Sequence, residues 1–207
     1  MTVTAEALLC DAGAIARRLD GFEVRPQQLE MAAAVRECMA KRGRLLVEAG
    51  TGVGKSFAYL IPAIERIVTA RERVVVVTHT ISLQEQLVEK DIPLLNAVIP
   101  DEFSAVLVKG RNNYVSLRRL KLASQRTEKL FHDEEERHAL QVIEDWAYDT
   151  RDGSLSTLPE LSRPSVWEHA QSDAHNCMGR RCPTYDKCFY QAARRRMEHG
   201  DLLVCNH

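Results

Sequence analysis

The sequence predicts an α/β fold in which a parallel sheet carries helices on both faces and is interrupted by a mostly α-helical insertion. Between residues 43 and 110, short apolar runs typical of strands alternate with longer runs of helical periodicity. After Gly110 the pattern becomes polar and helical, and an apolar run of the strand type returns only at 201–207. We therefore expect residues 1–109 and 191–207 to form the α/β domain and residues 110–190 to form the insertion.

The period of the apolar residues, and the residues that end each run, predict the individual elements. Pro26 marks the start of a helix, and Pro62 is expected to kink another. Four consecutive valines at 74–77 predict a strand buried on both faces, because such a run leaves no polar face. Helices are expected over 5–20, 27–40, 55–70, 82–95 and 117–150, with a basic helix over 189–200. Strands are expected over 43–50, 73–80, 103–110 and 201–207.

Charge is distributed unevenly along the insertion, although the net charge of the chain is only −1. Six basic residues and no acid lie between Lys109 and Arg126, whereas twelve acids and four basic residues lie between Glu128 and Asp173. From 175 to 196 the balance returns to six basic residues against one acid. Two basic segments therefore flank an acidic one, a pattern that ordinary solvated helix faces also produce.

The composition excludes two classes of protein. No run of eighteen apolar residues occurs, so we expect no membrane span. The N-terminal twenty residues lack a basic stretch before an apolar run, so we expect a cytosolic protein without a secretory signal. Six cysteines in such a chain do not indicate a disulfide framework, and Cys10, Cys38 and Cys205 are predicted to be small buried residues.

The stretch EAGTGVGKSF, 48–57, predicts a phosphate-binding loop between a strand and a helix. Its glycines let successive backbone N–H groups point at phosphate oxygens, and the positive end of the following helix faces the same anion. Lys55 and Ser56 are the catalytic candidates, because the ammonium can reach the β- and γ-phosphates and the hydroxyl can ligate Mg²⁺. The predicted residues for binding ATP and Mg²⁺ are Gly50, Thr51, Gly52, Val53, Gly54, Lys55 and Ser56.

Two further stretches lie where a nucleotide or a nucleic acid would be contacted. In VRPQQLEM, the Gln28 amide can both donate to and accept from an adenine edge, with Arg25 beside it. The plain alternative is that Gln27 and Gln28 are exposed residues at a helix start. In THTISLQEQL, Thr78 to Thr80 form the end of a predicted strand, at the edge where parallel sheets bind ligands. Their hydroxyls suit phosphate-backbone contacts, while Thr80 or Ser82 also suits a helix N-cap.

The stretch NCMGRRCPTYDKC places Cys177, Cys182 and Cys188 within twelve residues. Thiols gathered in this way indicate a metal site that lacks a fourth ligand. One alternative is zinc with His175 or Cys205 as the fourth ligand, although the gaps are wider than typical zinc spacing. The other alternative is three free thiols in a metal-free fold.

Seven motifs, in order, resemble superfamily 2 DNA helicases of the XPD type, and most closely their DinG-like bacterial branch, which includes YoaA. The motifs are VRPQQLEM, EAGTGVGKSF, THTISLQEQL, DIPLL, KGRNNYVSLRRL, the cysteine cluster and DLLVCNH. The resemblance spans about residues 25–207 and implies a P-loop NTPase (RecA-like) domain, interrupted by an iron–sulfur domain after the KGRNNY stretch. Residues 1–109 would then begin the first motor domain, 110–190 the iron–sulfur domain, and 191–207 the return into the motor.

The resemblance implies an ATP-dependent helicase that moves 5′→3′ on single-stranded DNA, in the bacterial cytosol and nucleoid. Its substrates would be branched DNA such as forks, flaps, displacement loops and DNA–RNA hybrids. Single-strand-binding protein or replication and repair factors would be its protein partners. The expected DNA contacts are Thr78, Thr80, Gln84, Lys109 and Arg111, and the basic segments add Arg118, Arg119, Arg180 and Arg181.

The sequence departs from the family in two respects. Ser116 stands where the family has the first cysteine of its [4Fe–4S] cluster, and a serine oxygen is a poorer iron ligand than a thiolate. A cluster held by Cys177, Cys182 and Cys188 would then be absent, labile or a three-iron form. The printed residues also stop before the family's DEAH box, so inefficient ATP turnover is expected of this chain alone. The alternative function is a DNA- or partner-binding module without hydrolysis; a standalone P-loop kinase would need a substrate lid that 110–190 does not resemble.

Overall fold

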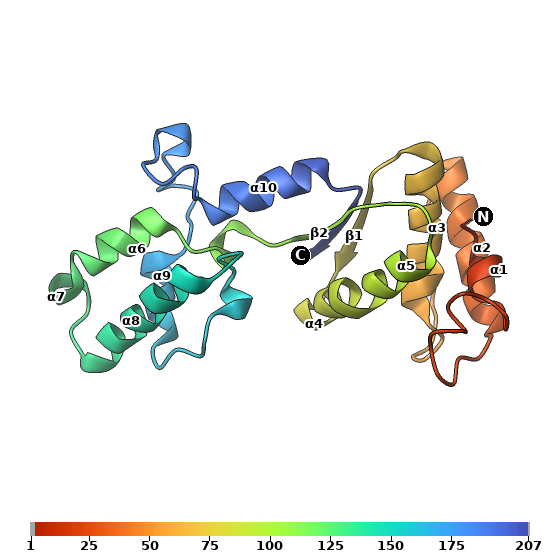
Figure 1. Ribbon diagram of the computed structural model, residues 1–207, viewed down its shortest axis with the longest axis horizontal. Coiled ribbons are helices and arrows are strands. Elements are labelled where there is room, and N and C mark those ends of the chain that lie inside the picture. The colour runs from red at the N-terminus through yellow and green to blue at the C-terminus, as the bar shows by residue number, and fades with distance from the viewer. Residues whose placement is uncertain (1–2, 207) are drawn as a thin grey trace. The chain divides into compact units, whose positions relative to one another are not determined.

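The computed structural model describes residues 3–206, and its internal contacts divide the chain into two compact units (Figure 1). The first unit comprises the described residues up to Val108 together with the segment from His199 onward. The second unit is Lys109–Glu198. The chain therefore leaves the first unit after its second strand and returns to it to form the third.

The first unit contains a three-stranded parallel sheet with helices packed against it. The strands are β1 (Val74–Thr78), β2 (Ala105–Val108) and β3 (Leu202–Asn206), in the order β1-β3-β2. Its helices are α1 (Ala5–Leu8), α2 (Pro26–Lys41), α3 (Lys55–Ala70), α4 (Ile81–Gln86) and α5 (Ile92–Val98), with a π-helical turn, η1 (Leu87–Asp91), between α4 and α5. The predicted parallel α/β architecture is confirmed.

The last strand occupies the centre of the sheet. Val204 pairs in parallel register with Val76 of β1 and with Leu107 of β2. Leu202 and Val204 are fully buried, as expected of a strand with neighbours on both sides. Formation of the sheet thus requires segments that are more than ninety residues apart in sequence.

Helix α3 carries much of the core of this unit. Its apolar residues recur at helical spacing, and Leu60, Ile61, Ile64 and Ile67 are buried. Helices α2 and α3 lie side by side (Figure 1), and Ala32 of α2 belongs to the same cluster of buried residues. Both helices match the ranges predicted from the sequence, and Pro26 occupies the first turn of α2.

Four predictions for this unit are wrong. Cys10, which was predicted to be buried, is exposed, and Cys38 and Cys205 are only partly buried. Residues 43–50 do not form a strand, and Leu46 is 98% exposed, because none of the three strands pairs with this segment. Strand β1 is buried on one face only, since Val75 and Val77 are more than half exposed. The predicted helix over 5–20 ends at Leu8, where the chain turns back so tightly at Gly13 that a Cβ there would overlap backbone atoms of Leu8.

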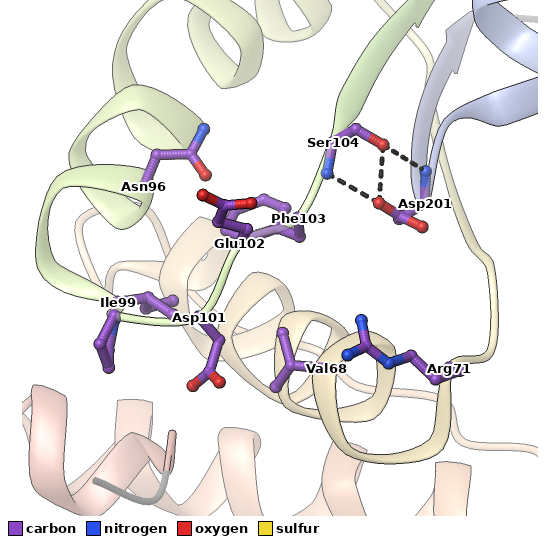
Figure 2. A pocket seen from close by; sticks show the side chains of 10 residues that line it. Val68, Arg71, Asn96, Ile99, Asp101, Glu102, Phe103, Ser104 and Asp201 are labelled. Atoms are coloured by element: carbon purple, nitrogen blue, oxygen red, sulfur yellow. Dashed lines mark hydrogen bonds between the residues drawn. The ribbon is translucent and has the colours of Figure 1, made fainter.

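Ser104 and Asp201 join the starts of β2 and β3 (Figure 2). The Ser104 backbone N–H and hydroxyl donate to Asp201 Oδ2 at 2.8 and 2.6 Å, and the Asp201 N–H donates to the Ser104 hydroxyl at 3.1 Å. A cavity of about 660 Å³ lies beside this pair, at the amino ends of the strands. Arg71, Asp101 and Glu102 contribute its charged lining (Figure 2).

The second unit is mostly helical. Its elements are α6 (Leu117–Ser124), α7 (Thr127–Leu130), α8 (Glu134–Asp149), α9 (Trp167–Ala170) and α10 (Phe189–His199), with the short 3-10 turns η2 to η5 at Arg111–Asn113, Leu155–Thr157, Pro164–Val166 and Gly179–Arg181. The buried residues Leu120, Phe131, Leu140 and Trp167 form one core between α6, α8 and α9, which lie together in Figure 1. The helical segments predicted at 117–150 and 189–200 are confirmed.

Two isolated bridges hold the start of this unit. Tyr114 pairs with Ser154, and Val115 pairs with Gln171, both antiparallel. The Ser116 N–H then donates to the Ala170 carbonyl at 2.8 Å. The segment before α6 is thereby fixed beside the chain that leads into the cysteine cluster.

Among residues 3–206, no helix combines the length and the apolar character that crossing a membrane would require.

Candidate functional site

The predicted phosphate loop lies at the start of α3 and has the backbone conformation that its glycines permit. Gly52 and Gly54 adopt φ values of 84° and 82°, a region that favours glycine. Helix α3 begins directly after Gly54, at Lys55. The N-terminal end of a sixteen-residue helix, with its unpaired N–H groups, therefore lies at an exposed loop that can surround an anion.

The Lys55 ammonium is bound to the loop's own backbone. Its Nζ donates to the carbonyl oxygens of Ala49 and Gly50 at 2.9 and 2.6 Å. These contacts hold the positive charge within the loop where phosphate oxygens are expected. Phosphate binding would replace two carbonyl acceptors by anionic oxygens, which form stronger charge-assisted hydrogen bonds.

Arg25 and Gln28 contact the phosphate loop, a role that the sequence did not indicate. The Arg25 guanidinium donates to the Gly52 carbonyl at 2.6 Å, and the Gln28 amide donates to the Gly54 carbonyl at 2.8 Å. Gln28 is 2% exposed, so the alternative of an exposed residue at a helix start is wrong for it. Both side chains from the start of α2 stabilise the loop backbone in this conformation.

Asp91 is a further polar residue at this site that our reading of the sequence missed. Its carboxylate is half-buried and accepts a 3.3 Å hydrogen bond from the Gln86 amide. Burial raises the pKa of the Asp91 carboxyl and of the Tyr59 hydroxyl, and the Ser56 hydroxyl acts in the opposite direction on each. The only sequence signal was one acidic residue inside the otherwise apolar DIPLL stretch.

The polar side chains Thr78, Thr80 and Gln84 of the THTISLQEQL stretch form hydrogen bonds within the first unit. Thr80 caps α4 by accepting from the Leu83 N–H at 3.3 Å, which confirms the capping alternative. Thr78 is 3% exposed and donates to the Thr80 carbonyl at 3.0 Å. Gln84 is 2% exposed, and its amide donates at 3.0 Å to the carbonyls of Val108 and Val204. Thr80 alone of these three presents an exposed side chain at the carboxyl edge of the sheet.

The predicted fourth ligand position and the three cysteines line one cavity in the second unit. Ser116, Cys177, Cys182 and Cys188 all contribute to a small cavity of about 30 Å³. His175, the zinc alternative, does not line it. The cysteines lie in successive tight turns, in which the N–H of Cys182 donates to Gly179 and that of Cys188 donates to Tyr185. Residues some sixty positions apart in sequence thus line the same cavity.

The environment of Cys177 favours its thiolate. The Gly179 N–H, at 3.5 Å from the sulfur, and next the Arg111 guanidinium hold the pKa of the Cys177 thiol below its ordinary value. The Arg118 charge acts in the same direction. A thiolate is the form that binds soft metal ions, so the chemistry of this position fits a metal ligand.

The donor set fits an iron–sulfur cluster only in part. Three thiols are present, but Ser116 supplies a hard oxygen that already accepts from the Arg119 N–H as the N-cap of α6. In the conformation described for residues 3–206, no three His, Cys, Asp or Glu side chains converge closely enough to hold a metal ion. A bound cluster would therefore require local rearrangement of the exposed cysteine turns.

Several arginines and a lysine predicted to contact DNA make contacts within the second unit. Arg119 donates to the carbonyls of Glu168 and Gln171, both at 2.7 Å, and Arg118 donates to that of Asn176 at 2.5 Å. Lys109 donates to the hydroxyls of Ser154 and Ser156. The Arg111 guanidinium lies 4.0 Å from the centre of the Tyr190 ring, at cation–π distance. Arg180 and Arg181 are exposed at the surface.

Comparison with known proteins places these features in a family context. The sequence matches the description "DEAD/DEAH box helicase" over residues 25–141. It is 34% identical over 202 residues to the ATP-dependent DNA helicase YoaA of Escherichia coli (strain K12), covering 94% of this chain and 30% of that protein. Identity to the ATP-dependent DNA helicase DinG of the same strain is 33% over 211 residues, covering 94% and 29%. Identity to the ATP-dependent helicase DinG of Mycobacterium tuberculosis (strain ATCC 25618 / H37Rv) is 36% over 209 residues, covering 91% and 31%. The chain thus spans about 30% of the length of these relatives.

Proposed function

This chain belongs to the DEAD/DEAH box helicase family, and on that premise we propose that it is the nucleotide- and DNA-binding part of an ATP-dependent DNA helicase. The observation that carries the proposal is the phosphate loop itself, in which Gly52 and Gly54 turn the backbone directly ahead of α3 and Lys55. The names of the relatives, ATP-dependent helicases, support the same reading. Movement in the 5′→3′ direction and action on branched DNA in repair are proposals for the whole protein.

The residues around the loop suggest how nucleotide is held. Backbone N–H groups of residues 50–54 would surround the phosphates, and Lys55 would exchange the carbonyls of Ala49 and Gly50 for phosphate oxygens. Arg25 and Gln28 would keep the loop in shape from α2 while their remaining donors and acceptors face an adenine base. Ser56, in the first turn of α3, would ligate the Mg²⁺ that accompanies the nucleotide.

DNA binding is proposed for the exposed polar residues at the carboxyl edge of the sheet and for the basic residues of the second unit. Thr80 is exposed in the first unit, and Arg180 and Arg181 are exposed in the second. Such residues suit contacts to phosphate groups of a single strand. Thr78 and Gln84 are buried, so in this conformation we assign them to support of the sheet edge.

An iron–sulfur cluster is proposed for the cavity formed by Cys177, Cys182 and Cys188, with Ser116 at the fourth position. A cluster bound there would cross-link the cysteine turns to the start of α6. The support is the shared cavity and the lowered pKa of the Cys177 thiol. The oxygen donor of Ser116 leads us to propose a site that binds iron less completely than one with four thiolates.

Binding of a fluorescent ATP analogue, with and without Mg²⁺, tests the proposed nucleotide site directly. We expect the chain to bind the analogue, Lys55→Ala to weaken binding by at least about tenfold, and Lys41→Ala to leave it unchanged. Lys41 is a suitable control because it is an exposed lysine at the far end of α2. Equal and negligible binding by all three proteins would refute the proposed function.

ATP hydrolysis with and without single-stranded DNA separates the leading function from the alternative. The alternative is a DNA- or partner-binding module without turnover. If single-stranded DNA stimulates ATP hydrolysis and Lys55→Ala abolishes it, this chain is itself an ATP-hydrolysing enzyme. Nucleotide and DNA binding without hydrolysis would establish the module.

A further inference from the structure

Two serine hydroxyls of the second unit hold the Lys109 ammonium. Its Nζ donates to Ser154 Oγ at 2.9 Å and to Ser156 Oγ at 2.6 Å, and the two serine oxygens lie 3.2 Å apart. The serines follow Lys109 by 45 and 47 positions in the sequence. Folding of this unit therefore gathers one cation and two hydroxyls into a cluster that the sequence did not indicate.

The charge of Lys109 has no negative partner in this cluster. Within the described residues 3–206, no carboxylate lies at ion-pair distance from its ammonium. The acid of the same turn is Asp152, whose Oδ1 accepts from the Ser154 N–H and from the hydroxyls of Thr150 and Thr157. Because Lys109 is partly buried and contacts neutral oxygens, an anion that reached it would compensate its charge.

The cluster has hydrogen-bond donors to spare. An ammonium has three N–H groups, and Lys109 directs two of them at the serines. Each hydroxyl has one proton, and only one of the two serines can donate to the other. At least one hydroxyl proton is thus available to an outside acceptor. Ser154 is 1% exposed whereas Ser156 is exposed, so Ser156 is the hydroxyl that such an acceptor can reach.

The backbone around the serines is fixed by contacts of its own. Ser154 forms an antiparallel bridge with Tyr114, and the Val115 N–H donates to the Gly153 carbonyl at 2.9 Å. The Thr157 N–H donates to the Ser154 carbonyl at 2.9 Å and closes the turn. Donors that are already in place lose little conformational entropy when a ligand binds.

We propose that Lys109 and Ser156, supported by the buried Ser154, bind one phosphodiester group of single-stranded DNA. Lysine ammonium and serine hydroxyl groups are common contacts of DNA phosphates. A phosphate oxygen also forms a stronger, charge-assisted hydrogen bond with an ammonium than a neutral hydroxyl does. This inference rests on the proposed DNA-binding function and adds to it two serines that lie outside the basic segments. Inorganic phosphate shares the same chemistry, so the test must separate the two sources.

The test is binding of a fluorescein-labelled oligothymidylate to the full chain, followed by fluorescence anisotropy at several salt concentrations. We expect Lys109→Ala to weaken binding by about tenfold and to reduce the salt slope by about 0.7. Ser156→Ala should weaken binding by about three- to tenfold and leave the slope unchanged, because it removes no charge. Lys129→Ala and Ser165→Ala are the matched controls, since both residues are exposed in the same unit, and both should bind like wild type.

The salt slope distinguishes a phosphate contact from structural support of the turn. Weaker binding by Lys109→Ala with an unchanged salt slope would assign Lys109 to the fold and overturn the proposal. If Lys109→Ala reduces folding, judged by circular dichroism, Ser156→Ala decides instead, because its exposed hydroxyl can be removed without opening the core. Wild-type affinity in a folded Ser156→Ala would then overturn the proposal.

Nuclear magnetic resonance separates DNA from free phosphate. The amide signals of Leu155 and Ser156 should shift on addition of oligothymidylate, and much less on addition of inorganic phosphate at matched ionic strength. Saturation of these shifts by inorganic phosphate, with none from oligothymidylate, would overturn the assignment to DNA.

Failure of this inference and failure of the proposed function give different results. A wild-type chain that binds no oligothymidylate overturns the DNA-binding part of the proposed function together with this inference. A wild-type chain that binds it, with unchanged affinity in Lys109→Ala and Ser156→Ala, overturns this inference alone.

Discussion

The side-chain amide of Gln28 donates a 2.8 Å hydrogen bond to the carbonyl oxygen of Gly54, twenty-six positions later in the sequence. This contact connects the first turn of α2 to the last residue before α3. The approach is so close that a Cβ at Gly54 would overlap the Gln28 amide. Glycine is therefore required here both by the positive φ of the backbone and by a neighbouring side chain.

Gly54→Ala should destabilise the first unit by about 1–3 kcal/mol, because alanine must adopt a left-handed backbone and displace Gln28. Gly50→Ala is the matched control, since a Cβ there meets no atom and its φ is not positive. Urea denaturation followed by circular dichroism measures the difference in unfolding free energy. Equal stability of the two variants would show that the loop rearranges without cost.

Gln84→Ala should lower the unfolding free energy by about 1–3 kcal/mol, because it leaves the carbonyls of Val108 and Val204 without their side-chain donor. Gln27→Ala, at an exposed position on α2, should change it by less than about 0.5 kcal/mol. The measurement is again denaturant unfolding. Unchanged stability with a loss of DNA binding would instead assign Gln84 to the DNA surface.

The Ser104–Asp201 pair should make stability depend on pH in the acid range. Hydrogen bonds from Ser104, with smaller contributions from Arg71 and Arg73, hold the pKa of Asp201 below its ordinary value. A lowered folded pKa contributes stability that is fully present above the unfolded pKa, about 3.9, and is lost as pH falls through the folded pKa.

Asp201→Asn should therefore lower the unfolding free energy by about 1 kcal/mol at neutral pH. The difference in unfolding free energy between this variant and wild type should become smaller below about pH 4. Urea denaturation at a series of pH values gives both curves. Asp11→Asn, which alters an exposed carboxylate, is the control and should show no such narrowing. A difference in unfolding free energy between Asp201→Asn and wild type that stays constant at the lowest pH measured would contradict a contribution from the lowered pKa of Asp201.

Ser116→Cys should increase the iron and sulfide bound per chain after anaerobic purification, because it adds a fourth thiol to the cavity of the three cysteines. The same change should weaken the cap of α6 by roughly 0.5–1 kcal/mol in the metal-free protein, since Ser116 accepts from the Arg119 N–H. Iron analysis and unfolding of the metal-free form measure the two effects. No gain in iron would show that another feature limits cluster binding.

Arg181→Ala and Arg119→Ala should have different consequences. Arg181 is exposed, so its loss should weaken single-stranded DNA binding and reduce the salt slope by about one. Arg119 holds the carbonyls of Glu168 and Gln171, so its loss should chiefly destabilise the second unit, by about 1–3 kcal/mol. DNA titrations at several salt concentrations, paired with unfolding curves, separate the two; identical behaviour of the variants would contradict these assignments.

The spacing of apolar residues in the sequence was sufficient to predict an element that is stabilised by its own residues, as helix α3 is. Helix α3 occupies the predicted 55–70, because its apolar stripe and its flanking glycine define both its face and its start. The predicted strand at 43–50 is absent for the opposite reason: a strand needs a partner, and an apolar run does not show whether one is available. The valines of β1 likewise predicted a strand buried on both faces. Burial of the second face depends on whether another element covers it, and the valines alone do not show that.

The same distinction between local sequence and tertiary contacts applies to the candidate site. From the sequence alone came the phosphate loop at 50–56 and the three clustered cysteines, and the family resemblance added Ser116 as the expected fourth position. Only the tertiary structure brought Arg25 and Gln28 onto the loop, because these contacts join segments 27 and 26 positions apart. The structure also buried Gln84 and engaged Arg119 within its unit. The sequence determines which side chains can donate or accept hydrogen bonds. The folded structure decides which acceptor each donor contacts, because the chain contains many donors and acceptors of the same chemical type.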